Sequence, residues 1–173
     1  MNRIVRIDHV DDPAQAVTGA EYVVVHAPLA EFPAEKDQAS VYFNSATWLA
    51  DGKLLAIERA SKRLTLVVID LTNATNLLGA AYENTLGPES LDPSLGLANL
   101  GITAATRTVV FDSNDTPELI LTPPGGAVSP SKLEGLALIN RTTVAIANDN
   151  DFGIDNKDDH SRLWIVKLKA PLR

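Results

Sequence analysis

Acidic and amide side chains gather at the two ends of one apolar stretch, "EGLALINRTTVAIANDNDFG", which runs from Glu134 to Gly153. Glu134 precedes its apolar middle, and "NDND" at 148–151 follows it with two carboxylates and two carboxamides on consecutive residues. Calcium takes about six to eight oxygen ligands of these kinds. The spacing is not that of an EF-hand, which needs alternating ligands, a central glycine and a closing glutamate. The run therefore indicates either a cation site or a turn in which Asn and Asp bond to neighbouring backbone groups.

A second acidic group, Glu58, lies in the apolar run "KLLAIER" and is followed directly by Arg59. Neighbouring residues on a strand point to opposite faces, so we expect that the two side chains cannot enter the core together. Either this strand end reaches solvent, or Glu58 faces a central channel where several strand ends converge. Glu134 has the same position relative to its own hairpin, and by itself it is also typical of a surface carboxylate.

The remaining motifs point to chemistry less strongly. "DNKDD" at 155–159, followed by His160, is more typical of a solvated turn than of a metal-binding loop. Gly125 and Gly126 lack the lysine and the strand-to-helix setting of a phosphate loop, and the sequence has no G-x-S-x-G elbow. The three histidines show no ligand spacing, and the apolar run around His26 indicates a core or edge position.

The composition is that of an ordinary globular protein, with 173 residues of which 45% are hydrophobic and 21% are charged. This length suits one domain spanning residues 1–173. A net charge of −7 argues against a nucleic-acid partner and suits cation binding or simple solubility. The absence of cysteine excludes disulfides and thiolate metal sites. No apolar run reaches the ~18–20 residues of a membrane span, and the opening "MNRIVRIDHVDDP" lacks the apolar region of a signal peptide.

Short apolar runs bounded by Gly, Pro, Asn and Asp predict strands separated by turns. They cover residues 3–8, 21–27, 53–59, 64–70, 107–112, 118–123, 142–148 and 162–168. The pair Asp51-Gly52, a favoured turn, predicts a hairpin within "WLADGKLLAIER", and "ASKR" closes a second one. Gly96 and Gly101 interrupt the segment 92–107, where we expect a long excursion with one helical turn.

One hairpin is echoed by another. Trp48–Arg59 and Leu138–Asp149 each consist of an apolar pair, a polar turn, four mostly apolar residues and two polar residues. Repeated hairpins of this kind are typical of the β-meanders that form propeller blades. A blade takes about 40–50 residues, so the chain would supply about four. The pattern predicts an all-β fold, a β-propeller-like array of antiparallel meanders that is part of a larger propeller.

Three stretches together resemble the phytase-like family, whose label is esterase-like activity of phytase. An "EGLA" hairpin followed by "DNDFG" is the signature of that family, "WLADGKLLAIER" resembles an earlier hairpin, and "SRLWIVKL" resembles a closing strand. They occur in the family's order over 41–170, with signature hairpins near 41–70 and 134–169. The resemblance implies a β-propeller-like fold, phosphoester hydrolysis and a bacterial protein that is periplasmic or secreted, of which this chain is a C-terminal portion. The matching positions are Glu58, Arg59, Glu134, Gly135, Asp149, Asn150, Asp151, Phe152 and Gly153.

The resemblance also implies a site. In a propeller, Glu58, Glu134 and Asp149 would lie at equivalent strand ends near one axis, where three carboxylates repel one another unless a cation or protons neutralise them. We therefore expect a Ca²⁺ ion held by Glu58, Glu134, Asp149, Asn150 and Asp151. The expected catalytic residues are Glu58, Arg59 and Glu134, with Arg59 binding phosphate through its planar fork.

Three functions follow from this expectation. The first is a Ca²⁺-dependent hydrolase of a small-molecule phosphoester, in which the cation polarises a phosphoryl oxygen and activates a water. The second is a non-catalytic propeller module that binds a partner and contains a structural Ca²⁺. The third is a hydrolase of another ester class. A cluster with one arginine supplies little positive charge for a polyanion such as phytate, whose binding requires several basic side chains.

Overall fold

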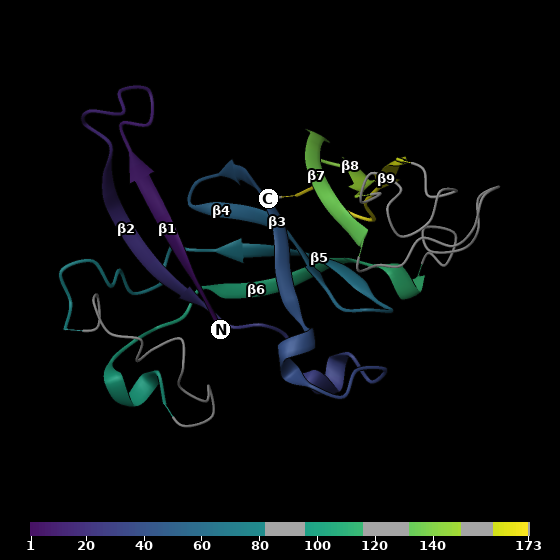
Figure 1. Ribbon diagram of the computed structural model, residues 1–173, viewed down its shortest axis with the longest axis horizontal. Coiled ribbons are helices and arrows are strands. Elements are labelled where there is room, and N and C mark those ends of the chain that lie inside the picture. Colours follow the sequence, from purple (N-terminus) through teal and green to yellow (C-terminus); the bar gives the residue numbers. More distant parts are fainter. Residues whose placement is uncertain (82–95, 116–131, 150–160, 173) are drawn as a thin grey trace. The chain divides into compact units, whose positions relative to one another are not determined.

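Strands account for the regular structure of the chain. The computed structural model describes residues 1–81, 96–115, 132–149 and 161–172, and in those residues the elements are strands and short 3-10 turns (Figure 1). The predicted all-β class is confirmed. The strands are β1 Asn2–Asp8, β2 Val17–Val24, β3 Tyr42–Ala50, β4 Lys53–Arg59, β5 Leu64–Asp70, β6 Thr106–Asp112, β7 Leu133–Asn140, β8 Thr143–Asn148 and β9 Leu163–Lys167. The run predicted at 118–123 lies outside the described residues.

The chain divides into two compact units. The first consists of Met1–His26, Asp51–Lys53 and Ile69–Arg107, and the second of Ala27–Ala50, Leu54–Val68 and Thr108–Arg173. Neither unit is a continuous stretch of sequence, so residues far apart along the chain build each one.

The first unit contains the antiparallel hairpin β1–β2, which pairs Asn2 with Val24 at one end and Asp8 with Val17 at the other. A parallel bridge joins Val24 to Ala105 beyond the hairpin. A small core lies beside it and consists of Val23, Leu77, Leu97 and Ile102. The expected helical turn in 92–107 is present as a 3-10 turn that Gly101 ends in the left-handed conformation, at φ 69°.

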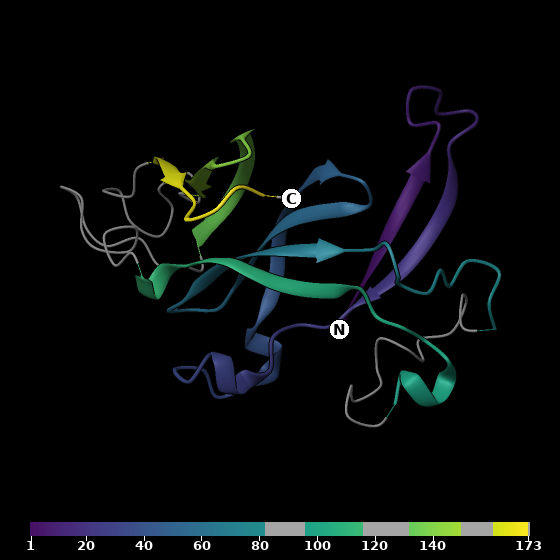
Figure 2. The same ribbon diagram turned by 180° about the vertical axis from the view of Figure 1, so that it is seen from behind.

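Two antiparallel meanders run in sequence order, β3-β4-β5-β6 and β7-β8-β9. Figure 2 shows β5 and β6 side by side from behind. The turn between β3 and β4 uses Asp51 and Gly52 at φ 49° and 75°, the conformation for which this dipeptide is favoured. The echoed hairpins Trp48–Arg59 and Leu138–Asp149 fall on β3–β4 and β7–β8. Within the part of the chain that the structure describes, the antiparallel sheets form no closed barrel, which is consistent with a partial propeller-like arrangement.

The main core lies between the two meanders of the second unit. β4 is buried along Leu55–Arg59, which requires both of its faces to be covered, as in a strand with an almost continuous apolar sequence. Alternate residues of β8 are buried, so one face of that sheet packs inward. The buried residues that meet are Leu55, Ile57, Leu64, Leu66, Leu133, Val144, Ile146, Val166, Leu168 and Leu172. This packing brings β3 and β7 beside each other and positions the candidate site.

Candidate functional site

Arg59 lies at the end of β4, almost completely buried, and connects the two meanders. Its Nη2 donates to Glu134 Oε1 at 2.7 Å. Its guanidinium carbon lies 4.7 Å from the centre of the Tyr42 ring, a cation–π contact. With the Asn44 amide oriented by its hydrogen bonds, the Asn44 oxygen accepts from Arg59 Nε at 3.2 Å and from Nη2 at 3.1 Å. Tyr42 and Asn44, two residues apart on β3, share the strand face that receives Arg59.

Glu134 occupies a β-bulge. In the β7–β8 ladder Leu133 pairs with Asn148 and Gly135 with Ala147, so Glu134 has no partner across the ladder. A bulge of this kind re-aims the extra side chain, and here the carboxylate reaches Arg59. The Glu134 side chain is 42% exposed whereas that of Arg59 is 3% exposed. A buried cation therefore holds a carboxylate that water can reach.

Gly135 is required beside the bulge because the two strands approach closely there. A Cβ atom at this position would lie 3.0 Å from the Cβ of Ala147. The glycine and the small alanine thus let β7 carry the bulge without separating from β8. This explains in physical terms why a glycine at 135 stands opposite an alanine at 147.

Asp149 lies at the same end of the hairpin as Glu134. Its backbone N–H donates to the Lys132 carbonyl at 2.7 Å, one pair beyond Leu133–Asn148. Asn148 fixes the start of β9, because its side-chain oxygen accepts from the Arg162 N–H at 2.6 Å. Asn150 and Asp151, together with 155–159 and His160, lie outside the described residues.

Glu58 points to the other face of β4. Its Oε1 accepts from the Ala27 N–H at 2.6 Å, and its Oε2 lies 3.4 Å from the Thr65 hydroxyl. Glu58 and Arg59 are both buried, so the expectation that the pair cannot enter the core together is wrong. The physical reason is the covering of both faces of β4, which takes in opposite-pointing neighbours at once.

The predicted metal ligands can be compared with these positions. Within residues 1–81, 96–115, 132–149 and 161–172, no three His, Asp or Glu side chains lie together as a group that could hold a metal ion. Glu134 and Asp149 share one end of a hairpin, whereas Glu58 bonds to groups on the far face of β4. The proposed Ca²⁺ site, with Asn150 and Asp151 in it, stays a prediction.

The family model labelled "Phytase-like: Esterase-like activity of phytase" matches residues 2–152. The chain belongs to the phytase-like family. No curated protein and no solved structure matches it. In this phytase-like chain the signature "EGLA" forms the bulge, the glycine contact and the start of a core strand, and the "ER" of the earlier hairpin supplies the arginine that meets the bulge.

Sequence reasoning missed Tyr42 and Asn44. Both precede the "WLADG" hairpin in an unremarkable polar stretch, and only the packing of β3 beside β7 shows that they contact Arg59. His26 hydrogen-bonds Asn2 Oδ1 through Nε2 at 2.9 Å. Burial, then the positive N-terminus and Arg107, lower the pKa of His26 to about 4, so it is neutral near pH 7. None of the described helices is of the length and apolarity that a membrane crossing requires.

Proposed function

We propose that this chain carries the hydrolytic site of a phytase-like phosphoesterase and that Glu134 is its central carboxylate. The observation that supports the proposal is the bulge, which holds Glu134 half-exposed against the buried guanidinium of Arg59. Carboxylates in this setting act as general bases or as ligands of a cation, and a fixed orientation favours both roles. The family supports a hydrolase of small molecules as the class of function.

Arg59 has a positioning role in this proposal. The resemblance assigned it to phosphate binding, but its side chain is 3% exposed and it donates to Glu134 and Asn44. A dissolved phosphate would have to displace these partners and enter the core, which would remove charged groups from water at considerable cost. Arg59 instead fixes one carboxylate oxygen of Glu134 and leaves the other to accept a proton from an attacking water.

The donors present fit a hard cation such as Ca²⁺. Glu134 and Asp149 supply carboxylates at one end of the hairpin, and Asn150 and Asp151 follow directly in the sequence. A bound Ca²⁺ would supply Lewis-acid polarisation of the ester oxygen. The Glu58 carboxylate does not fit this set, since it accepts a backbone N–H on the other face of β4. We therefore propose Asp149, Asn150 and Asp151 as ligands beside the Glu134 base, with Glu58 joining β4 to the segment at Ala27.

The burial of Arg59 also favours a second candidate, a hydrolase of uncharged esters. An accessible arginine binds a phosphate dianion strongly, whereas an uncharged carboxylic ester does not need one. A site whose arginine is buried therefore suits the carboxylic ester better. The two candidates share Glu134 and differ in substrate charge. We also propose that the protein is exported, as the family resemblance implied.

The test compares turnover of p-nitrophenyl phosphate, phytate and p-nitrophenyl acetate by the 173-residue chain, with Ca²⁺ and with chelator. We expect phosphate-ester turnover that chelator removes; turnover of the acetate alone would favour the second candidate. No turnover of any substrate under any metal would overturn the enzymatic proposal. A melting temperature that chelator leaves unchanged would count against tightly bound Ca²⁺.

Glu134→Gln should lower turnover by about 10²–10⁴-fold, the contribution expected of a general base. Glu21→Gln is the matched control, because Glu21 also accepts from an arginine, Arg3 Nη1, at 2.7 Å. It should keep full turnover. If Glu134→Gln is as active as this control while both remain folded, Glu134 is not the catalytic carboxylate.

A further inference from the structure

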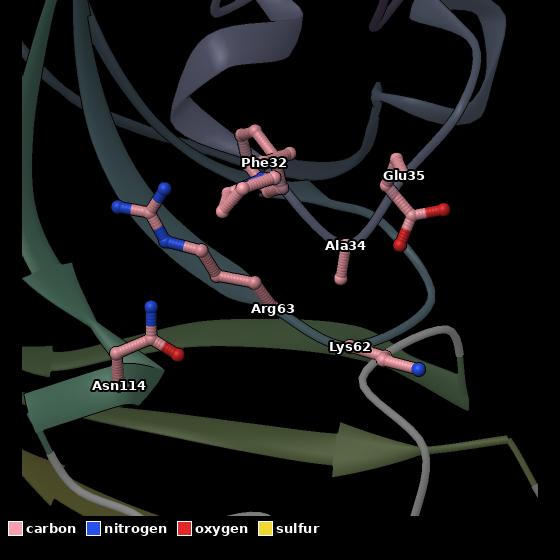
Figure 3. A pocket seen from close by; sticks show the side chains of 7 residues that line it. Phe32, Ala34, Glu35, Lys62, Arg63 and Asn114 are labelled. Atoms are coloured by element: carbon pink, nitrogen blue, oxygen red, sulfur yellow. The ribbon is translucent and has the colours of Figure 1, made fainter.

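A pocket of about 180 Å³ lies beside the β4–β5 turn, within the second unit (Figure 3). The segment after β2 supplies an apolar wall, the turn supplies two basic residues, and the 3-10 turn Ser113–Asp115 after β6 supplies an amide. The lining residues are Phe32, Pro33, Ala34, Glu35, Lys62, Arg63 and Asn114. The proposed hydrolytic site uses none of these residues.

Arg63 forms a fixed wall of this pocket. Its Nε donates to Asp112 Oδ1 at 3.1 Å, its Nη2 donates to Asp112 Oδ2, and its guanidinium stacks 4.9 Å from the centre of the Phe32 ring. The hydrogen bond to Asp112 raises the pKa of Arg63 against the opposing effect of burial. Two of its N–H donors are therefore held by a carboxylate, and its guanidinium plane covers Phe32.

The charges around the pocket exclude a simple anion as its best ligand. Glu31 and Glu58 lie close enough to Arg63 to raise its pKa further, in addition to Asp112. Glu35 adds a fourth carboxylate at the rim. Against these stand Arg63 and Lys62, so the surroundings are negative on balance, and a small anion would be repelled.

Glu35 and Lys62 place opposite charges at one rim. Glu35 Oε1 accepts from the Ser61 N–H at 3.1 Å and from the Ser61 hydroxyl, and these two bonds fix the carboxylate. Lys62 follows Ser61 and is exposed. Among the described residues no ion pair joins Lys62 to Glu35, although both line the same pocket. A ligand that carries both signs of charge would satisfy the two together.

We propose that this pocket binds a small zwitterion, an α-amino acid with an apolar side chain. Its ammonium group pairs with Glu35, its carboxylate with Lys62, and its side chain packs on the exposed residues Pro33 and Ala34. The volume of about 180 Å³ leaves room for a small molecule rather than for a single water or ion. The negative surroundings favour the ammonium end and Lys62 favours the carboxylate end, so neither a pure cation nor a pure anion fits as well.

The ligand test follows backbone amide shifts of the isotope-labelled 173-residue chain by NMR during titration with leucine. N-acetyl-leucine, which lacks the ammonium charge, and leucine amide, which lacks the carboxylate, should each bind about tenfold more weakly, the effect of one charge-assisted hydrogen bond. The shifted amides should include those of residues 34–35 and 61–63. No shift at roughly 20 mM leucine, beyond the range of weak specific sites, overturns the proposal. Equal binding of leucine and both analogues overturns the zwitterion and leaves an apolar pocket.

The variant test separates the site from its surroundings. Glu35→Gln keeps an oxygen for Ser61 but removes the charge, and Lys62→Gln removes the other charge; each should weaken leucine binding about two- to fivefold, as expected of partly exposed pairs. Lys36→Gln is the control, since Lys36 is exposed and adjacent in sequence but does not line the pocket. If all three variants bind leucine as the wild type does, the charges play no part. These results do not depend on whether the chain hydrolyses esters.

Discussion

Two arginines flank the β4–β5 turn, and each forms the same chemical unit with a different outcome. Arg59 donates to Glu134 and stacks on Tyr42, and Arg63 donates to Asp112 and stacks on Phe32. The first pair links β4 to β7 across two meanders, whereas the second joins the start of β5 to the end of β6 within one. The Glu134 side chain is 42% exposed and that of Asp112 20%.

The difference shows that an arginine–carboxylate pair has no fixed role. The Arg63–Asp112 pair is bidentate and partly buried at both ends, so it serves as a clamp between neighbouring strands. In the Arg59–Glu134 pair the arginine is buried and the carboxylate is partly exposed, so Arg59 holds the Glu134 carboxylate where water can reach it. Only the Arg59–Glu134 pair leaves a carboxylate oxygen for chemistry.

The largest expected effect on stability is that of Arg59→Met. Removing a buried arginine leaves Asn44 and Glu134 without their donor, and we expect the free energy of unfolding to fall by about 2–4 kcal/mol, less than for a fully buried pair because water can reach Glu134. Arg63→Met should lower it by about 1–2 kcal/mol, since both partners are partly exposed. Urea unfolding of both variants measures the two values. An equal or larger loss for Arg63→Met would contradict the distinction between the pairs.

A change at the bulge tests whether the hairpin itself presents Glu134. Gly135→Ala would place a Cβ against Ala147, and the crowding should cost about 1–3 kcal/mol of unfolding free energy. Ala147→Gly removes the opposing Cβ, so the double variant should recover part of the loss, which a double-mutant cycle detects by urea unfolding. Purely additive effects would show that the contact does not limit this position.

Local sequence patterns predicted the strands well where a strand depends mainly on its own residues and the turns beside it. Residues 53–59 and 64–70, expected from apolar runs and turn residues, are β4 and β5. The strand expected at 21–27 instead spans Val17–Val24, because pairing with β1 recruits Val17 and Thr18 into the ladder, with Gly19 as the unpaired bulge residue between Thr18 and Ala20. That pairing is a tertiary effect, and strand propensity alone does not indicate it.

The candidate site was only partly predictable for the same reason. Glu134 and Arg59 could be named from motifs, but the hydrogen bond between them spans 75 positions, and neither the bulge nor the Asn44 contact has a local sequence signal. The expectation for Glu58 and Arg59 failed because strand alternation gives directions but does not say which faces the rest of the fold will cover.

The smallest expected effect is the pH dependence of the stability that the Arg63–Asp112 pair contributes. Burial raises the pKa of Asp112, but the Arg63 hydrogen bond and the Asn114 N–H outweigh it and hold that pKa below the ordinary value of 3.8. A carboxyl with a lowered folded-state pKa adds stability that is present above its unfolded pKa and is lost as pH falls through the folded value.

We therefore expect Asp112→Asn to be less stable than the wild type above about pH 4, by less than about 1 kcal/mol given the partial exposure, and the gap to narrow below it. Urea unfolding from pH 2.5 to 7 measures this gap. Asp115→Asn is a control on the neighbouring turn, because Asp115 pairs with Lys169 through exposed side chains and should show a smaller gap at every pH. If the difference in unfolding free energy between Asp112→Asn and the wild type widens on acidification, Arg63 does not stabilise the Asp112 carboxylate. The contrast between the two arginine pairs would then not be one of side-chain exposure alone.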